Sequence, residues 1–171
     1  MIKKLFITLI CIGGIAFTGF TQRYAIIDSK YILEKIPEYK TAQQKLNQFS
    51  ELWQLEIDRK SGELDKMYKD YDAEQVMLGD DLKKKREDQL FNKEKELKDL
   101  QKKRYGYEGD IFKKRQELIK PIQDRVYNAV QKLAISKLYD FILDKSEGIT
   151  VIFADPKLDR SDEVLKFLGV K

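Results

Sequence analysis

Carboxylates and amines are the reactive side chains that this sequence offers in quantity. Its 171 residues include 29 acidic and 33 basic side chains and no histidine. Most carboxylates recur beside lysines on stretches of helical composition, the usual pattern of a solvated, charge-rich helix. Glycine-rich phosphate loops and residues at metal-ligand spacing are missing from the sequence, while Asp155, Pro156 and Asp159 have the pattern of a turn and a helix cap. We therefore expect no enzymatic activity, no metal and no cofactor.

Residues 1–21 have the three-part pattern of a secretory signal peptide. A short basic head precedes the uncharged apolar run Leu5–Phe20, and Gly19 and Thr21 place small residues at the usual cleavage positions. The alternative is a transmembrane anchor, but the run is shorter than the ~20 residues that a spanning helix needs. We predict cleavage and export to a bacterial periplasm.

Cleavage would remove the single cysteine, Cys11, and leave a mature chain that starts near Gln22. That chain would have no disulfide and no thiol chemistry. It would contain 31 basic and 29 acidic side chains, a net charge of only +2. This near-balance argues against nucleic acid as a partner.

The start of the mature chain predicts a strand followed by helices. Tyr24–Ile27 is rich in aromatic and β-branched residues, as strands are. Asp28 can cap a short helical turn over Tyr31–Leu33. Pro37 suits the first turn of a long helix.

The last fifty residues combine one helix, two strand signals and a final short helix. Pro121 should kink the chain into a helix with an apolar stripe formed by Ile122, Val126, Val130 and Leu133. Phe141–Leu143 and Thr150–Phe153 predict strands, separated by a turn at Lys145–Gly148. Ser161 begins the final helix, which Gly169 ends and whose apolar face is Val164, Leu165 and Leu168.

Apolar residues between Pro37 and Pro121 recur at seven-residue intervals, which predicts a coiled coil. One series is Ile57, Leu64, Tyr71 and Leu78, with Trp53, Lys60, Met67 and Glu74 at the alternate seam position. The later series is Leu90, Leu97, Arg104, Ile111 and Leu118, with Leu100 and Tyr107 beside it. Polar intruders in both series indicate a loose coil.

Leu78–Asp81 is the best point for the coil to fold back on itself. Gly79 can end one helix, and Asp80 or Asp81 can cap the next. Residues 38–80 carry a net charge of −4 and residues 81–120 one of +5, so two antiparallel arms would attract. We predict a helical hairpin over 37–120 with its tip near 78–81.

Gly106 and Gly109 would lie inside the returning helix, where each glycine costs about 1 kcal/mol relative to alanine. Folding at Gly79 places them opposite Trp53 and Phe49. Either they make room for those two rings or they form a hinge.

Residues 22–36 and 121–171 would together form a small body that the hairpin interrupts. Its few short strands and helices are too little to close a stable core in one chain, and open strand edges pair readily. We predict that copies of the chain complete it. The residues expected in this oligomer body are Ile26, Ile27, Phe141, Leu143, Val151, Phe153, Leu165 and Leu168.

The hairpin tip is the candidate contact surface for a partner. It combines soft and aromatic side chains with a basic run: Met67, Tyr68, Tyr71, Val76, Met77, Leu78, Lys83, Lys84, Lys85 and Arg86. The Met and Tyr side chains suit promiscuous contact, and the basic run suits attraction of anionic clients or lipid headgroups. The alternatives are a packed seam and a solvated face. Lys102–Arg104 and Lys113–Arg115 add positive charge further along the returning arm.

Three stretches carry a resemblance to a known family: "YAIIDSKYILEKIPEYKTAQQKL", "PIQDRVYNAVQKLA" and "FILDKSEGITVIFADPKLDRSDEVLKFLG". With the signal peptide and the hairpin, they resemble the Skp/OmpH family of periplasmic chaperones over essentially the whole mature chain. One departure is Ser136–Leu138, where many relatives have a glycine.

The resemblance implies a mainly α fold with a small β body. Three chains would form a jellyfish-like homotrimer, with a long coiled-coil hairpin inserted between the strands of each chain and the hairpins surrounding a cavity. It implies ATP-independent holding of unfolded outer-membrane β-barrel proteins, and lipopolysaccharide binding in some members. A second hypothesis is a structural adaptor that docks a folded envelope partner through the hairpin tip.

Overall fold

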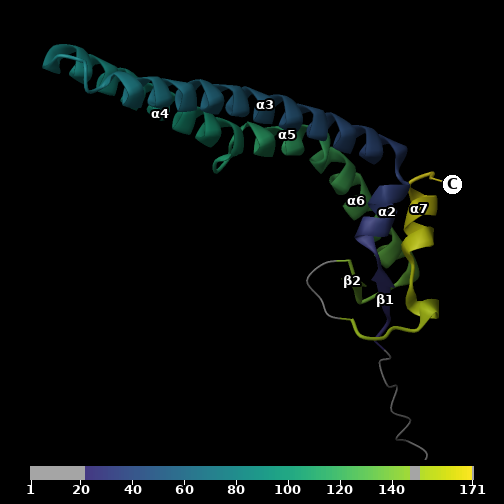
Figure 1. The fold of residues 1–171 in the computed structure, drawn as a ribbon. Coiled ribbons are helices and arrows are strands. Elements are labelled where there is room, and N and C mark those ends of the chain that lie inside the picture. Colours follow the sequence, from purple (N-terminus) through teal and green to yellow (C-terminus); the bar gives the residue numbers. More distant parts are fainter. Residues whose placement is uncertain (1–21, 147–150, 171) are drawn as a thin grey trace, which may run out of the picture.

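The computed structural model describes residues 22–146 and 151–170. The predicted signal peptide, residues 1–21, lies outside the described residues. Figure 1 shows a compact end, here called the body, and a long helical hairpin, here called the arm. The body consists of β1 (Tyr24–Ile27), α2 (Ser29–Lys35), α6 (Lys120–Lys137), β2 (Phe141–Asp144), the 3-10 turn η1 (Pro156–Leu158) and α7 (Ser161–Phe167). The arm consists of α3 (Pro37–Glu74), α4 (Asp80–Tyr105) and α5 (Asp110–Leu118). The expected mainly helical chain with a small sheet is therefore confirmed.

The sheet brings together two segments that are far apart in sequence. β1 and β2 pair in parallel, with Tyr24 opposite Phe141 and Ile27 opposite Asp144. Parallel strands need a long crossover connection, and here the crossover is the arm with α2 and α6. The strands predicted at Tyr24–Ile27 and Phe141–Leu143 are confirmed.

The third predicted strand, Thr150–Phe153, is wrong for Val151–Phe153, which form no strand in the described chain. Thr150 lies outside the described residues, as does part of the turn predicted before it. The free side of β1 is occupied by another segment, because Ile26 bridges to Asp159 and its carbonyl accepts a 2.8 Å hydrogen bond from the Arg160 amide. Val151–Phe153 therefore do not extend the sheet beside β1.

Buried apolar side chains from every helix of the body form one core. Its members are Ile27, Ile32, Ile36, Ala42, Leu46, Ile119, Ile122, Val126, Ala129, Leu133, Val164 and Leu165. The predicted stripe on α6 faces this core. Ala42 and Leu46 belong to α3, so the core continues into the base of the arm.

Short polar side chains start the small elements of the body as the sequence predicts. The Tyr31 amide donates to Asp28 Oδ1 at 2.9 Å and caps α2. The Ser161 amide and hydroxyl donate to Asp159 Oδ1 at 2.9 and 2.6 Å, at the start of α7. Asp155 accepts from the Lys157 amide and caps η1. Gly169 follows α7 with φ 74°, as expected for a C-terminal glycine.

The arm reverses direction between Glu74 and Asp80, close to the predicted break. Gly79 is the residue that precedes α4. The prediction that an aspartate caps this helix is wrong, because Asp80 and Asp81 lie in its first turn. There their charge favours the positive end of the helix dipole.

The seam of the hairpin is only sparsely apolar. Ile57, Leu64 and Leu90 are buried, and the remaining predicted seam residues are partly buried, except for two. Glu74 and Tyr107 are exposed, so their assignment to the seam is wrong. Instead, Glu74 forms an ion pair across the hairpin, with its Oε2 3.6 Å from Arg86 Nη2.

The returning arm is two helices, so the continuous helix predicted through Gly106 and Gly109 is wrong. α4 ends at Tyr105 and α5 begins at Asp110, and the connecting loop stands off the arm on the side away from α3 (Figure 1). A Cβ on Gly106 would collide with the Lys102 carbonyl oxygen, and one on Gly109 would lie 2.9 Å from the Gly106 and Lys103 carbonyl oxygens. The glycines thus permit close backbone approach, and the expectation that they accommodate Trp53 and Phe49 is wrong. The hinge alternative stays a prediction.

α6 (Lys120–Lys137) is followed by a left-handed residue that is not glycine. Leu138 follows the helix with φ 57°, in the left-handed region that glycine occupies most easily. A leucine therefore holds a position that favours glycine.

Candidate functional site

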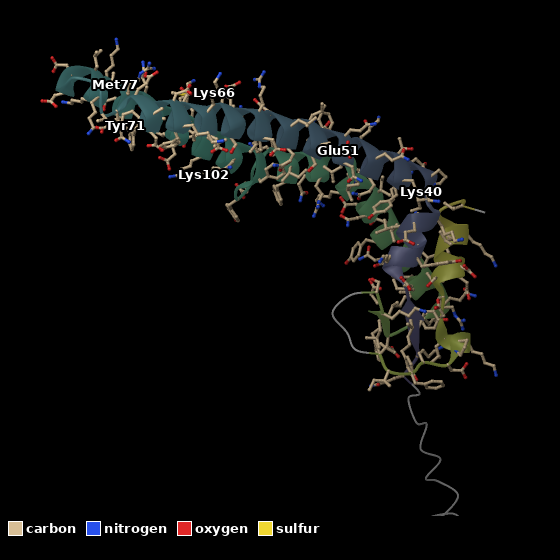
Figure 2. The ribbon with its side chains drawn as sticks, viewed as in Figure 1. Lys40, Glu51, Lys66, Tyr71, Met77 and Lys102 are labelled. Atoms are coloured by element: carbon tan, nitrogen blue, oxygen red, sulfur yellow. The ribbon has the colours of Figure 1, made fainter. Side chains whose placement is uncertain are left out.

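Two apolar side chains are left almost fully exposed at the tip of the arm. Val76 is 91% and Met77 is 82% exposed, and Figure 2 shows Met77 at the far end of the hairpin. Leu78 beside them is partly buried. Of the predicted contact residues on the arm, these two are the most accessible apolar groups.

The tyrosines and methionine just below the tip are engaged between the two helices. The Tyr71 hydroxyl donates to Glu87 Oε1 at 2.6 Å, and this hydrogen bond raises the pKa of Tyr71 to about 12. The Tyr68 hydroxyl lies 3.5 Å from Glu94 Oε2. Met67 and Tyr71 line a small cleft of about 80 Å³ against Leu90. These residues stabilise the hairpin, whatever else they contact.

The basic run at the start of α4 is mostly free for contact. Lys84 and Lys85 are exposed, and neither forms an ion pair with any residue in the described ranges. Lys83 is partly buried, and Arg86 pairs with Glu74 across the hairpin. The tip therefore presents exposed lysines together with the exposed Asp80 and Asp81, a few residues from Val76 and Met77 in sequence.

A second exposed surface lies at the loop between α4 and α5, which the sequence analysis assigned to the seam. Tyr107 is 96% exposed, and a pocket of about 290 Å³ lies beside it. The lining residues are Tyr105, Gly106, Tyr107, Glu108, Ile111, Phe112 and Arg115. The signal in the sequence was "YGYEG", because two glycines three residues apart in a coiled coil indicate an interruption as well as a soft helix.

Arg104 fastens the arm just before this loop. Its Nη1 donates to Asp110 Oδ2 at 2.6 Å and its Nη2 to Glu56 Oε2 at 2.9 Å. The guanidinium also lies over the Trp53 ring, 5.1 Å from its centroid. One side chain thus joins α3, α4 and α5 where the helix is interrupted.

The body presents a third surface, on the side of β2. The Tyr24 and Phe141 rings stack at 5.6 Å and are both more than one-third exposed. A pocket of about 340 Å³ lies between the sheet, α2 and α6, with mainly apolar lining from residues such as Ile27, Leu33, Val126, Val130 and Ile142. Within the described residues, β2 pairs with β1 alone.

The predicted oligomer residues divide into two groups in the single chain. Ile26, Ile27 and Leu165 are buried within it, and Leu143, Val151 and Leu168 are partly buried. Phe141 is exposed on the stack, and Phe153 is 84% exposed beside the exposed Ile152. Phe141 and Phe153 are the members that a second chain could bury.

Two ionised aspartates accept hydrogen bonds from loop segments of the body. Burial raises the pKa of Asp159, but hydrogen bonds from Lys145 and Ser161 outweigh burial, and the net pKa lies below its ordinary value. Burial likewise raises the pKa of Asp144, and hydrogen bonds from Ser29 and Ser146 reverse this. The Lys145 Nζ lies 2.7 Å from Asp159 Oδ2. Both carboxylates are thus held in their charged form.

The described residues were also compared with the patterns of a metal site and of a membrane-spanning helix. In residues 22–146 and 151–170, no group of acidic, histidine or cysteine side chains is arranged to hold a metal ion. Among the same residues, no helix is long and apolar enough to cross a membrane.

Comparison with known proteins gives one family and one fold. The family model described as "Outer membrane protein (OmpH-like)" matches residues 23–168. No curated protein matches the chain in sequence. A crystal structure of a candidate outer membrane chaperone (OmpH-like) from Caulobacter crescentus CB15 superposes with a TM-score of 0.63 at 17% identity, covering 90% of each chain. At that identity the superposition shows a shared fold.

Proposed function

The chain belongs to the OmpH-like family, and from this premise we propose that it is an ATP-independent chaperone that holds unfolded outer-membrane β-barrel proteins in the periplasm. One observation carries the proposal: a long arm with a sparse apolar seam displays apolar and aromatic side chains that no residue of the described chain covers. Val76, Met77 and Tyr107 are the clearest of these. Export would follow from the signal peptide predicted at residues 1–21.

Such a surface suits holding without an energy source. Each exposed group offers a small apolar contact, and free lysines nearby offer electrostatic attraction. Because association costs translational and ordering entropy, many weak contacts are needed before a client stays bound. A client held in this way can leave without ATP when a better partner appears.

The chaperone would act as a homotrimer whose bodies meet on the β2 side. Phe141 and Phe153 are exposed, an apolar pocket lies between the sheet and α6, and β2 has a free edge in the described chain. Exposed apolar patches of this kind mark protein interfaces, and open edges pair. Three arms extending from one assembled body would surround a cavity for the client.

The test uses the mature chain, residues 22–171, and one urea-unfolded outer-membrane β-barrel diluted into buffer. We expect light scattering to give the mass of a trimer, and near-stoichiometric protein to suppress the aggregation of the barrel. Phe153→Asp should give monomers and weaken the suppression, while Lys132→Glu on the exposed face of α6 should change neither. A trimer that never delays aggregation would refute the chaperone, and a monomeric wild type would refute the assembly.

A structural adaptor is the second candidate, favoured by the compact tip patch of Val76, Met77, Lys84 and Lys85. An adaptor predicts one folded envelope partner in a pull-down, lost on Lys83→Glu with Lys85→Glu. A chaperone predicts a broad set of unfolded barrels that survives the same change. Vesicles of anionic lipid and of lipopolysaccharide, added separately, test the remaining use of the basic tip.

A further inference from the structure

The loop between α4 and α5 has features that hairpin packing does not require. Tyr107 projects with 96% of its surface exposed, and the next residue, Glu108, has φ 51°. A left-handed conformation is unfavourable for a residue with a side chain and persists where the surroundings impose it. Figure 1 shows the loop on the inner side of the bend between arm and body. The loop thus lies on the side of the space that the arm and the body flank, and it keeps its aromatic residue Tyr107 exposed.

The size and lining of the adjacent pocket restrict what it can bind. Three aromatic rings, those of Tyr105, Tyr107 and Phe112, line it together with Ile111. Its volume of about 290 Å³ lies at the lower end of the roughly 300–1,000 Å³ of ligand sites. One inserted ring, stacked offset or edge-to-face on its neighbours, fits this space better than a cofactor does.

Charge around the pocket is positive. Arg115 lines the pocket, and Lys102, Lys103 and Lys113 flank it in sequence; none of the four forms an ion pair within the described part of the chain. Figure 2 shows Lys102 on the α4 side of the arm. Of the nearby acids, Asp110 is engaged by Arg104 at 2.6 Å, and Glu108, which lines the pocket, offsets only one of the four positive charges. The surface therefore attracts carboxylates, and the guanidinium of Arg115 can bind one through two hydrogen bonds.

We propose that this pocket binds an aromatic side chain of an extended client segment, while Arg115 and the three lysines pair with carboxylates beside that side chain. The proposal rests on the proposed chaperone function and gives it a preferred client chemistry. Segments that alternate aromatic and acidic residues are held more tightly than segments that offer either property alone.

Peptide binding to the mature chain tests the site separately from chaperone activity. Three dye-labelled octapeptides are compared by fluorescence anisotropy: alternating Asp and Phe, alternating Asp and Ala, and alternating Lys and Phe. The Asp–Phe peptide should bind at least about 5-fold more tightly than either of the others. Its binding should weaken at about 0.5 M salt, where screening shortens the reach of the charges.

Variants then locate the binding. Tyr107→Ser should weaken Asp–Phe binding at least 5-fold, whereas Phe91→Ser, which removes an exposed ring elsewhere on α4, should leave it unchanged. Arg115→Glu should weaken binding of the Asp–Phe peptide and strengthen that of the Lys–Phe peptide, while Lys132→Glu should do neither. Circular dichroism of each variant checks that the helices remain.

Two results would overturn the site. One is equal binding of the Asp–Phe peptide to the wild type and Tyr107→Ser, or no binding to either. The other is a lower mass of Tyr107→Ser in light scattering, which would make the pocket a contact between copies of this chain. Neither result affects the proposed function, because the wild-type aggregation assay decides that separately.

Discussion

The body and the arm are both mainly helical, yet different forces hold them together. The body buries a continuous cluster of apolar side chains drawn from β1, all of its α-helices and the base of α3. Beyond that base, α3 and α4 bury only Ile57, Leu64 and Leu90, and α5 buries none. The arm relies instead on helix-internal hydrogen bonds and a few polar contacts such as Arg104 to Glu56. Long helices form their hydrogen bonds internally and tolerate a seam with few apolar contacts, whereas a two-stranded sheet needs a packed core. We therefore expect the body to resist deformation more than the arm does.

The largest difference in stability between the body and the arm is expected when one buried side chain is truncated in each. Leu133→Ala should lower the free energy of unfolding by about 2–5 kcal/mol, because Leu133 is completely buried in the body. Leu90→Ala in the arm should cost about 1–2 kcal/mol, because neighbouring side chains can close around the smaller residue. Urea unfolding at one fixed protein concentration measures the effect of Leu133→Ala, since the proposed trimer would add to stability.

Hydrogen exchange measures the second effect residue by residue. Leu90→Ala should speed exchange in α3 and α4 and leave the β1 and α6 amides protected. Equal losses of protection in the body and the arm would show that the two regions unfold as one unit and that the comparison is wrong. Leu55→Ala, an exposed position on α3, serves as the control.

Arg104 tests whether a polar contact can replace apolar packing in the arm. Arg104→Met should destabilise the hairpin locally by about 1–2 kcal/mol, since it leaves Glu56 and Asp110 without their partner. The loss is limited because Arg104 Nε is itself buried without a hydrogen-bond partner among the described residues. Exchange should accelerate around residues 104–112, and the fluorescence of Trp53, the single tryptophan, should change. An unchanged exchange profile would mean that the helix interruption needs no fastening.

Two substitutions that change the backbone preference of one residue should each raise stability by a smaller amount. One replaces a glycine in the arm, and the other introduces a glycine in the body. Gly62→Ala in the middle of α3 should stabilise the arm by about 0.5–1 kcal/mol, because a Cβ there meets nothing within 4 Å. Leu138→Gly should stabilise the body by about 1 kcal/mol, because it relieves a left-handed leucine that is largely exposed. Thermal unfolding measures both.

Gly106→Ala is the matched control for the two stabilising changes. It should destabilise the arm, because the new Cβ would collide with the Lys102 carbonyl oxygen. If Gly62→Ala lowered the melting temperature as Gly106→Ala does, the continuous helix through Gly62 would be wrong.

Acid should produce the smallest difference between the two regions. The pKa values of Asp144 and Asp159 are lower in the folded body than in an unfolded chain, so the unfolded chain binds more protons as pH falls. Their contribution is therefore complete above the ordinary aspartate pKa of about 3.9 and is lost as pH falls through the lowered values. Stability should stay flat between about pH 6 and 8, because the sequence has no histidine.

In the arm the corresponding acid effect depends on salt. Hydrogen bonding to Lys98 lowers the pKa of Glu94, but both groups are solvent-exposed, and screening weakens such pairs. Asp159→Asn should remove part of the acid sensitivity of the body at any salt concentration, as followed by unfolding between about pH 2 and 5. An acid transition that vanishes at high salt would assign the effect to the arm instead.

Most of the elements were predictable because their signals are local. Asp28 before Tyr31, Pro37 at the start of α3 and Pro121 in the first turn of α6 each act on their own backbone neighbours. The seven-residue spacing likewise predicted a coiled coil from positions within single helices. These features need no knowledge of what lies across the molecule.

The predictions that failed depended on distant partners or on local backbone geometry that composition does not reveal. Thr150–Phe153 has strand composition, but Asp159 and Arg160 occupy the outer side of β1, and Val151–Phe153 do not pair with the other edge of the sheet, that of β2. Tyr107 keeps the seam spacing, yet the loop after Tyr105 turns its ring outward. The pocket beside it was missed for the same reason, since it forms where α4 and α5 are interrupted.

The sequence by itself determined where α2, α3, α6 and α7 begin, that the middle of the chain doubles back, and that the two ends are richer in strand-forming residues. Only the tertiary structure decided that β1 and β2 run parallel, which apolar groups stay uncovered and where the returning helix is interrupted. Helix signals act within a few residues, so composition and spacing record them. Strand pairing and surface exposure depend on which segments meet after the chain has folded, and that outcome is spread over the whole molecule.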